Sequence, residues 1–185
     1  MTKVTYGMMV SLDGYIAGPA GGPSLPVPDD ALHRHFNELQ RQATVSLYGR
    51  RMYDVMQYWE TADQQPDAPE VELEFARFWK ATPKVVVSST LTSVGPNARL
   101  VKGGLEQLVR GLRAAPDADI QVAGAGIAAS LSRLGLIDEY RLYFYPLVLG
   151  AGTPFFEAGS SLQLEPIGQE KLSQGVVMMR YRPPA

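Results

Sequence analysis

The stretch IQVAGAGIAA, residues 120–129, joins a short apolar run to a turn with two glycines and then to a helical pattern. Its first four residues are typical of a buried strand. Ile127, Leu131 and Leu134 then recur at the spacing of one helix face. Gly124 and Gly126 are the small residues that a tight turn from strand to helix needs. The stretch therefore predicts one strand–helix unit of an α/β protein.

The same alternation of strand and helix extends over most of the chain. Apolar residues three and four positions apart predict helices around residues 52–56, 71–79 and 105–112, and from residue 124 onward. A further helix is expected after the loop at residues 14–28, with Asp29 or Asp30 as its N-cap. Strands are expected at residues 4–10, 44–48, 84–88, 120–123, 140–149 and 176–181.

This order predicts a single domain, residues 1–185, with an α/β fold built on a mostly parallel mixed sheet. No helical pattern separates the last two strands, so we expect them to pair antiparallel at an edge of the sheet. Both are long and apolar for an edge, which proteins normally protect. A homodimer that covers these two strands is therefore predicted.

Composition excludes several classes of protein. The chain has 185 residues, of which 45% are hydrophobic and 19% charged, and its formal net charge is −2. These values do not fit a disordered chain or a coiled coil. The charge does not fit a dedicated nucleic-acid binder. The absence of cysteine excludes disulfides and thiol chemistry, and two histidines are too few for a histidine-rich metal site, so no metal is expected.

The first residues lead directly into a strand pattern rather than into a charged region and a long apolar run. No apolar run approaches the roughly 20 residues that span a bilayer. We therefore expect a cytoplasmic protein with no membrane partner.

Ligands of parallel α/β sheets bind outside the carboxyl ends of the strands. Four segments are expected there: the loop after Val10, residues 49–53, residues 88–91 and residues 124–128. All four are rich in glycine, hydroxyl groups or arginine. Their convergence predicts a site for a phosphate-containing ligand.

Each of these motifs also has a purely structural interpretation. The glycine turn loosely fits G-x-G-x-x-A, in which backbone amides approach a pyrophosphate, but small residues also serve any tight turn. Arg50 and Arg51 can hold phosphate oxygens with two hydrogen bonds each, or they are ordinary solvated arginines. Ser88 and Ser89, with Thr90, offer hydroxyls to phosphate or ribose, or they simply begin a polar loop.

Acidic residues and histidines also have both functional and structural interpretations. Asp13 lies at the mouth of the predicted cleft, although Asp-Gly is also a common turn sequence. Asp30 is a second acid–base candidate if it does not merely cap the helix. His33 and His35 are two residues apart and so point to different helix faces, which predicts surface histidines rather than a shared metal site.

Taken in order, these segments resemble the dihydrofolate-reductase-like superfamily. The closer similarity is to the reductase domain of the bifunctional riboflavin-biosynthesis deaminase-reductase. It extends from residue 4 to residue 181. The motifs that carry it are SLDGYIA at residues 11–17, LYGRRMY at 47–53, KVVVSS at 84–89, GAG at 124–126, and the tail LIDEY to PLVLGAG at 136–152.

This resemblance implies a three-layer αβα fold that binds NADPH along the carboxyl edge of the sheet. By position, it assigns the adenosine 2′-phosphate and pyrophosphate to the glycine–arginine turn and the ribose to the serine pair. It assigns the pyrophosphate also to the glycine turn and the nicotinamide to backbone atoms after the first strand. The residues so implied are Gly49, Arg50, Arg51, Met52, Ser88, Ser89, Gly124, Ala125, Gly126, Ile127, Met9, Ile16 and Ala17.

Two positions differ from the pattern of the family. Met52 stands where dihydrofolate reductases often have threonine, and Ala125 replaces a glycine. The sequence therefore predicts an NADPH-dependent reductase that transfers hydride to a carbonyl or imine carbon of a small, pterin- or pyrimidine-like substrate. Asp13 and then Asp30 are the candidates to orient the substrate or donate a proton, with a raised pKa if buried, and water is the alternative donor. A nucleotide-binding module without turnover and a true Rossmann dehydrogenase are the rival interpretations.

Overall fold

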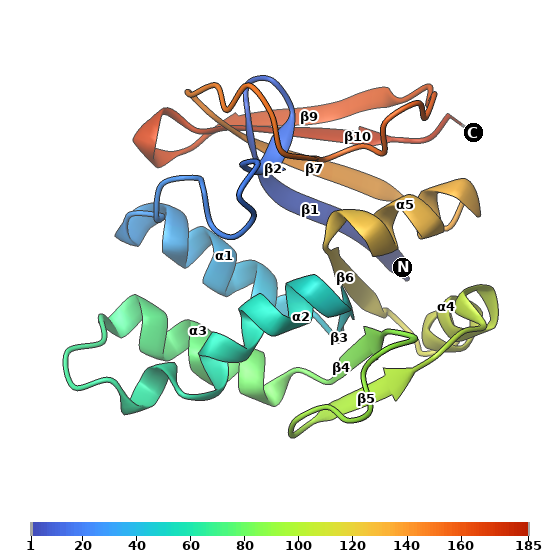
Figure 1. Ribbon diagram of the computed structural model, residues 1–185, viewed down its shortest axis with the longest axis horizontal. Coiled ribbons are helices and arrows are strands. Elements are labelled where there is room, and N and C mark those ends of the chain that lie inside the picture. The colour runs from blue at the N-terminus through green and yellow to red at the C-terminus, as the bar shows by residue number, and fades with distance from the viewer. Residues whose placement is uncertain (1, 185) are drawn as a thin grey trace.

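The computed structural model describes residues 2–184, in which one mixed sheet of eight strands forms the centre of the fold (Figure 1). The strand order is β5-β4-β3-β6-β1-β7-β10-β9. The sheet strands are β1 (Lys3–Ser11), β3 (Val45–Gly49), β4 (Lys84–Val87), β5 (Ala98–Val101), β6 (Asp119–Ala123), β7 (Glu139–Tyr145), β9 (Glu165–Lys171) and β10 (Val177–Arg182). Two short strands, β2 (Tyr15–Ala17) and β8 (Thr153–Pro154), pair with each other.

The helices are α1 (Asp30–Gln42), α2 (Arg50–Met56), α3 (Glu70–Ala81), α4 (Leu105–Arg113) and α5 (Ala125–Arg133), with single 3-10 turns at Gln57–Glu60, Ala62–Gln64 and Ser173–Gly175. Residues on one face of the sheet pack against α1, α2 and α3, and residues on the other face pack against α4 and α5. The predicted α/β fold with helices on both faces of a mostly parallel sheet is therefore confirmed.

The parallel part of the sheet runs from β5 to β7, and each neighbouring pair within it is parallel. β10 is antiparallel to both β7 and β9. Because α/β connections return each chain segment to the same end of the sheet, β4, β3, β6 and β1 all end at one edge. These four strands are also consecutive in the sheet, which brings the segments that follow them together.

The late strands pair antiparallel as predicted, but the prediction that they form the edge is wrong. β7 lies between β1 and β10, and β9 is the edge strand. The sequence of β9, EPIGQEK, has no apolar alternation, which is why it was not predicted. Its charges and its proline are typical protection for an edge strand. The homodimer was predicted from an exposed apolar edge strand, and the structure has no such strand at this edge.

Helix α1 begins where Asp29, not Asp30, acts as the N-cap, because its Oδ1 accepts a hydrogen bond of 2.9 Å from the Leu32 amide. The prediction that His33 is a surface residue is wrong. Its ring is buried and bonds the side chain of Asn37 at 2.8 Å, since α3 packs against this side of α1. His35 is half-buried and lies 3.2 Å from the Tyr143 hydroxyl.

None of the helices within residues 2–184 is long and apolar enough to cross a membrane.

Candidate nucleotide-binding site

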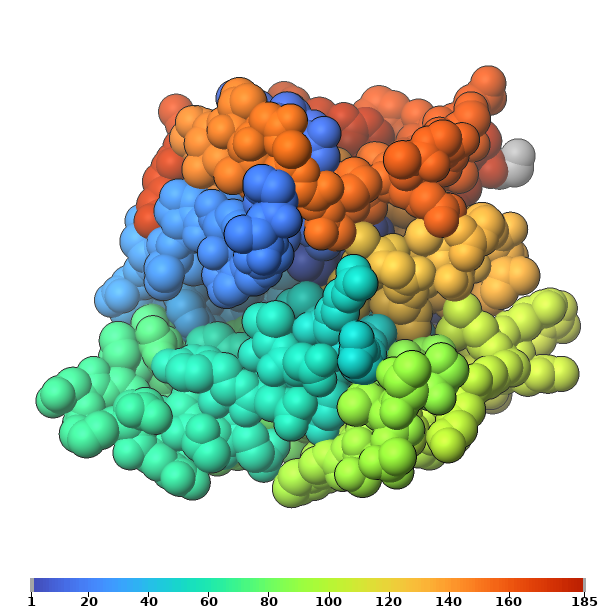
Figure 2. All heavy atoms as spheres, viewed as in Figure 1, coloured from blue at the N-terminus to red at the C-terminus, as the bar shows by residue number. Residues whose placement is uncertain are grey.

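The four strand-end segments converge as the sequence predicts. Figure 2 shows a hollow on this face of the molecule, between the blue and orange segments above it and the cyan and yellow segments below it. The cyan segment is α2 and the yellow one is α5, which follow the neighbouring strands β3 and β6. The hollow is thus bordered by the first turns of two helices and by the loop after β1.

The two glycine turns touch each other. Gly124 has a φ of +106°, and a Cβ added to it would lie 3.0 Å from the Cβ of Met52. A Cβ added to Gly49 would lie 3.7 Å from the side chain of Ile127. Glycine at residue 124 therefore permits both the backbone conformation and the close approach. Met52 packs on this turn.

The first turn of α5 is open to an anionic ligand. The helix has no side-chain cap, and its first backbone bond runs from the Ala128 amide to the Gly124 carbonyl at 3.1 Å. The amides of Ala125, Gly126 and Ile127 thus have no acceptor within the helix. Gly126 is exposed, with no atom within 4 Å of a Cβ added there. The side chain of Ile127 is buried, so only its backbone can contribute to a ligand site.

Arg50 and Arg51 occupy the first two positions of α2, beside this turn, and both are exposed. No hydrogen bond or ion pair joins either guanidinium to another side chain in the part of the chain that the structure describes. Exposed arginines elsewhere are of both kinds: Arg41 and Arg110 pair with Glu38 and Glu106, whereas Arg77 and Arg99 have no ion pair among the described residues. Two adjacent unpaired arginines beside uncapped helix amides favour the recognition of an anion over the interpretation as ordinary surface charge.

Ser88 and Ser89, the two serines after β4, have different surroundings. The hydroxyl of Ser88 is buried and accepts hydrogen bonds from the amides of Thr90 at 3.2 Å and Leu91 at 3.1 Å. Its hydrogen-bonding capacity therefore shapes the turn. Ser89 is exposed, so of the two serines it is the one whose hydroxyl faces solvent and can meet a ligand.

The residues implied for the nicotinamide lie on the other side of the hollow. Met9 is half-buried in β1, and its sulfur accepts a hydrogen bond of 3.3 Å from the Tyr145 hydroxyl. Ile16 and Ala17 form β2, which pairs with β8. A Cβ added to Gly152 would lie only 1.9 Å from the Ala17 carbonyl oxygen, so the two backbones meet with no space for a side chain.

The carboxylate of Asp13 is fixed by hydrogen bonds from nearby and distant parts of the chain. Its Oδ1 accepts hydrogen bonds from the Ser11 hydroxyl at 2.6 Å and the Leu149 amide at 3.1 Å, and its Oδ2 accepts one from the Gly150 amide at 2.7 Å. The Ser11 hydroxyl above all, with these amides, lowers the pKa of Asp13. Asp13 is exposed, so the raised pKa expected of a buried acid does not arise at this position.

Asp30 points to solvent at the first turn of α1. Its side chain is 72% exposed and lies 3.8 Å from the guanidinium of Arg34. The structure does not bring Asp30 into contact with Asp13. The catalytic role of either residue stays a prediction.

Sequence reasoning missed the 147–152 segment as part of this site. Gly150 and Gly152 both have positive φ, one bonding Asp13 and the other contacting Ala17. The signal was present in the glycine pair of LGAG, residues 149–152, which was noted only as part of the family resemblance. Its partners lie about 136 residues away, a distance that no local pattern covers.

The residues of the hollow fit a dinucleotide. Its diphosphate would meet the free amides of the α5 first turn. A 2′-phosphate would meet the exposed guanidinium groups of Arg50 and Arg51. Because an added side chain at Gly126 would project into open space, a ligand can approach the backbone there.

The family model for the RibD C-terminal domain matches residues 2–178. Among curated proteins, the uncharacterized protein YyaP of Bacillus subtilis (strain 168) is 28% identical over 181 residues, which cover 97% of this chain and 94% of YyaP.

Solved structures show the same fold. A protein from Shewanella sp. PV-4, provisionally named as a riboflavin biosynthesis protein, is 26% identical with a TM-score of 0.75, and each chain is covered completely. A pyrimidine reductase-like protein of Corynebacterium diphtheriae is 13% identical with a TM-score of 0.68 over the whole of this chain and 92% of its own. A deaminase/reductase of Thermotoga maritima is 16% identical with a TM-score of 0.68, and this chain covers 57% of its length.

The resemblance predicted from the sequence is thus confirmed. Because the family model matches nearly the whole sequence, the chain belongs to the RibD C-terminal domain family.

Proposed function

We propose that the protein is an NADPH-dependent reductase that transfers hydride to a carbonyl or imine carbon of a small, pterin- or pyrimidine-like molecule. The observation that carries this proposal is the meeting of two unpaired arginines with the uncapped first turn of α5. Membership of a family of riboflavin-pathway reductase domains supports it. The name of the Thermotoga protein points to the same class of reaction.

In this proposal each segment of the hollow has one task. Arg50 and Arg51 bind the 2′-phosphate, the amides of residues 125–127 bind the pyrophosphate, and Ser89 bonds the ribose. Backbone atoms of Met9, Ile16 and Ala17 hold the nicotinamide. The bound cofactor supplies the hydride, and the protein supplies orientation and electrostatics.

The accompanying proton comes from water in this account. Asp13 has a lowered pKa and so is ionised at neutral pH, which makes it a poor proton donor. Asp30 is exposed and has solvent around it. We infer that Asp13 acts as a positioning residue, because its carboxylate joins the turn that precedes β2 to the segment that precedes β8.

The surroundings of Asp13 and Asp30 favour a second candidate function. Asp13 has a lowered pKa and Asp30 points to solvent, which is also what a nucleotide-binding module without turnover would show. Such a module would bind NADPH but reduce nothing. The two candidates therefore share the cofactor and differ only in turnover.

Titration with NADPH tests both candidates together. A ligand that binds only the native state raises the melting temperature by mass action, so NADPH is expected to raise it and to quench the fluorescence of Trp59 or Trp79. A protein that shows neither effect with millimolar NADPH or NADP⁺ would contradict both. Oxidation of NADPH with a panel of cyclic imines and ketones then separates the reductase, which turns over, from the binding module, which does not.

A further inference from the structure

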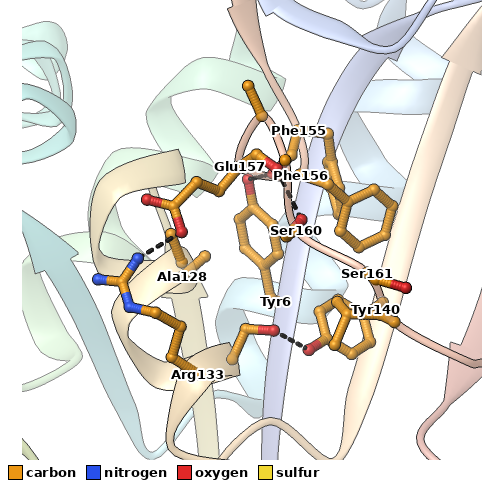
Figure 3. Close-up of a pocket in the computed structure, with 14 residues that line it drawn as sticks. Tyr6, Ala128, Arg133, Tyr140, Phe155, Phe156, Glu157, Ser160 and Ser161 are labelled. Atoms are coloured by element: carbon orange, nitrogen blue, oxygen red, sulfur yellow. Dashed lines mark hydrogen bonds and ion pairs between the residues drawn. The ribbon is translucent and has the colours of Figure 1, made fainter.

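A second hollow lies on the α5 side of the sheet. Its volume is about 440 Å³, within the range of small-molecule sites. Figure 3 shows it between α5 and the segment after β8, with the rings of Tyr6, Tyr140, Phe155 and Phe156 around it. Tyr6, one of its lining residues, lies four residues before Val10 in β1, about 13 Å of strand from the carboxyl end.

The walls of this hollow are aromatic and flat. Tyr6 stacks on Phe155 with ring centroids 4.3 Å apart, and Tyr140 lies tilted against Phe156 at 5.6 Å. Helix α5 contributes the small side chains of Ala128 and Ala129 to the lining. A hollow lined by aromatic rings and small side chains suits a planar ring, since offset and edge contacts between rings are favourable.

The hydroxyls in the hollow retain hydrogen-bonding capacity. The Ser132 and Tyr140 hydroxyls lie 2.8 Å apart and share one hydrogen bond (Figure 3). Burial raises the pKa of Tyr140, so both groups are protonated at neutral pH. Two hydroxyls carry two hydrogens and their mutual bond uses one. The other hydrogen has no acceptor among the described residues, so an acceptor on a ligand would complete the pair.

The rim has no net charge. Arg133 forms an ion pair with Glu157, and the hydroxyl of Ser160 donates to the Glu157 carbonyl at 2.6 Å (Figure 3). A balanced pair at the mouth offers no attraction to an ionic ligand. From the aromatic walls, the unmatched hydroxyl hydrogen and the neutral rim, we propose that this hollow binds an uncharged, planar aromatic compound with a hydrogen-bond acceptor on its edge. The hollow is not lined by residues 125–127, whose amides are proposed to bind the pyrophosphate, and the proposal does not depend on NADPH binding.

Quinolin-2-one is a suitable probe, because it is planar, neutral and carries a carbonyl beside an N–H. We expect saturable binding without any nucleotide, with a dissociation constant of roughly 0.1–1 mM for a ligand of about eleven non-hydrogen atoms. Benzoate, which is anionic, and cyclohexanecarboxamide, which is not planar, are expected to bind at least tenfold more weakly. Calorimetry and ligand-observed NMR measure these affinities.

Two substitutions locate the bound probe. Ala129→Phe fills the hollow from α5 and is expected to weaken binding at least tenfold. Ser130→Phe, one residue later on the same helix and outside the hollow, is expected to leave binding unchanged. Tyr140→Phe keeps the ring and removes a hydroxyl, so it is expected to weaken binding roughly three- to tenfold. Melting curves identify any variant that does not fold, and Tyr140→Phe still tests the proposal if Ala129→Phe fails.

Two results would overturn the proposal. One is the absence of saturable binding by the folded wild type. The other is equal binding by the wild type and by the folded Ala129→Phe or Tyr140→Phe variants. A third result would also refute the small-molecule site. If the affinity for the probe falls as the protein concentration rises, and the molecular mass of the protein doubles over the same range, a second copy of the chain occupies the hollow.

Discussion

The carboxylate of Asp13 accepts a hydrogen bond of 2.7 Å from the backbone amide of Gly150, which follows it by 137 residues. Together with the bond from the Leu149 amide, this contact joins the turn after β1 to the segment before β8. β2 and β8 then pair directly. The backbone proposed to hold the nicotinamide is thus fixed by a contact between distant parts of the sequence.

Asp13→Asn is expected to loosen this connection. An amide side chain has one acceptor oxygen, so the Leu149 and Gly150 amides cannot both keep their present partners. Hydrogen exchange of these two amides should accelerate at least tenfold, measured by NMR or mass spectrometry. Asp63→Asn, which removes a carboxylate from Lys80 elsewhere, is the control and should leave them unchanged. Unaltered exchange in Asp13→Asn would show that the carboxylate does not hold the segment.

Gly152→Ala is expected to destabilise the fold. Its Cβ would overlap the Ala17 carbonyl oxygen, and its φ of +143° is already unfavourable for a side chain. Overpacking with backbone strain predicts a loss of about 2–4 kcal/mol in the free energy of unfolding, measured with urea. Gly150→Ala is the matched control, because its φ is +77° but no atom lies within 4 Å of the added Cβ. It should lose only about 1 kcal/mol, and equal losses would refute the steric explanation.

We expect the stability of the fold to decrease at low pH because of Glu139. Its side chain is 2% exposed and pairs with Lys3, Arg141 and Arg180. Burial opposes its ionisation, but hydrogen bonds from Arg180, Arg141 and Lys3 outweigh burial and hold the pKa of Glu139 to about 2. Because this value lies below the ordinary 4.5, the stabilisation is complete above pH 4.5 and is lost as the pH falls toward 2.

Glu139→Gln should therefore lower the free energy of unfolding by about 3 kcal/mol at pH 7, since three cations lose their common partner. The difference from the wild type should shrink as the pH falls from 4.5 to 2. Glu106→Gln, which breaks the exposed pair with Arg110, should change it by less than about 0.5 kcal/mol. A difference between wild type and Glu139→Gln that does not vary with pH would contradict the assignment of this pKa.

The convergence of strand ends could be predicted because it follows from local patterns and from the handedness of α/β connections. The β–α unit at residues 120–129 needed only its own sequence. β9 could not be predicted, because its residues are polar on both faces and its pairing depends on β10. The burial of His33 could not be predicted either, because it results from the packing of α3 against α1.

Site residues show the same division. The position of Arg50 and Arg51 at a strand end could be predicted, because local sequence sets it. The hydrogen bonds of the Ser88 hydroxyl were not predicted, because they depend on the geometry of its turn. Those of the Asp13 carboxylate were not predicted, because they come from distant amides. A carboxylate in a sequence does not reveal which backbone amides will reach it.

The most direct test of the proposed cofactor is a comparison of NADPH and NADH binding to Arg50→Ala, Arg51→Ala and the double variant. The two cofactors differ by one 2′-phosphate, so the account predicts that the double variant loses on the order of 10²-fold in NADPH affinity. NADH affinity should barely move, and the NADPH effect should shrink at high salt. Unchanged NADPH affinity in the folded double variant would contradict the account, and equal losses for both cofactors would refute the assignment of these arginines to the 2′-phosphate.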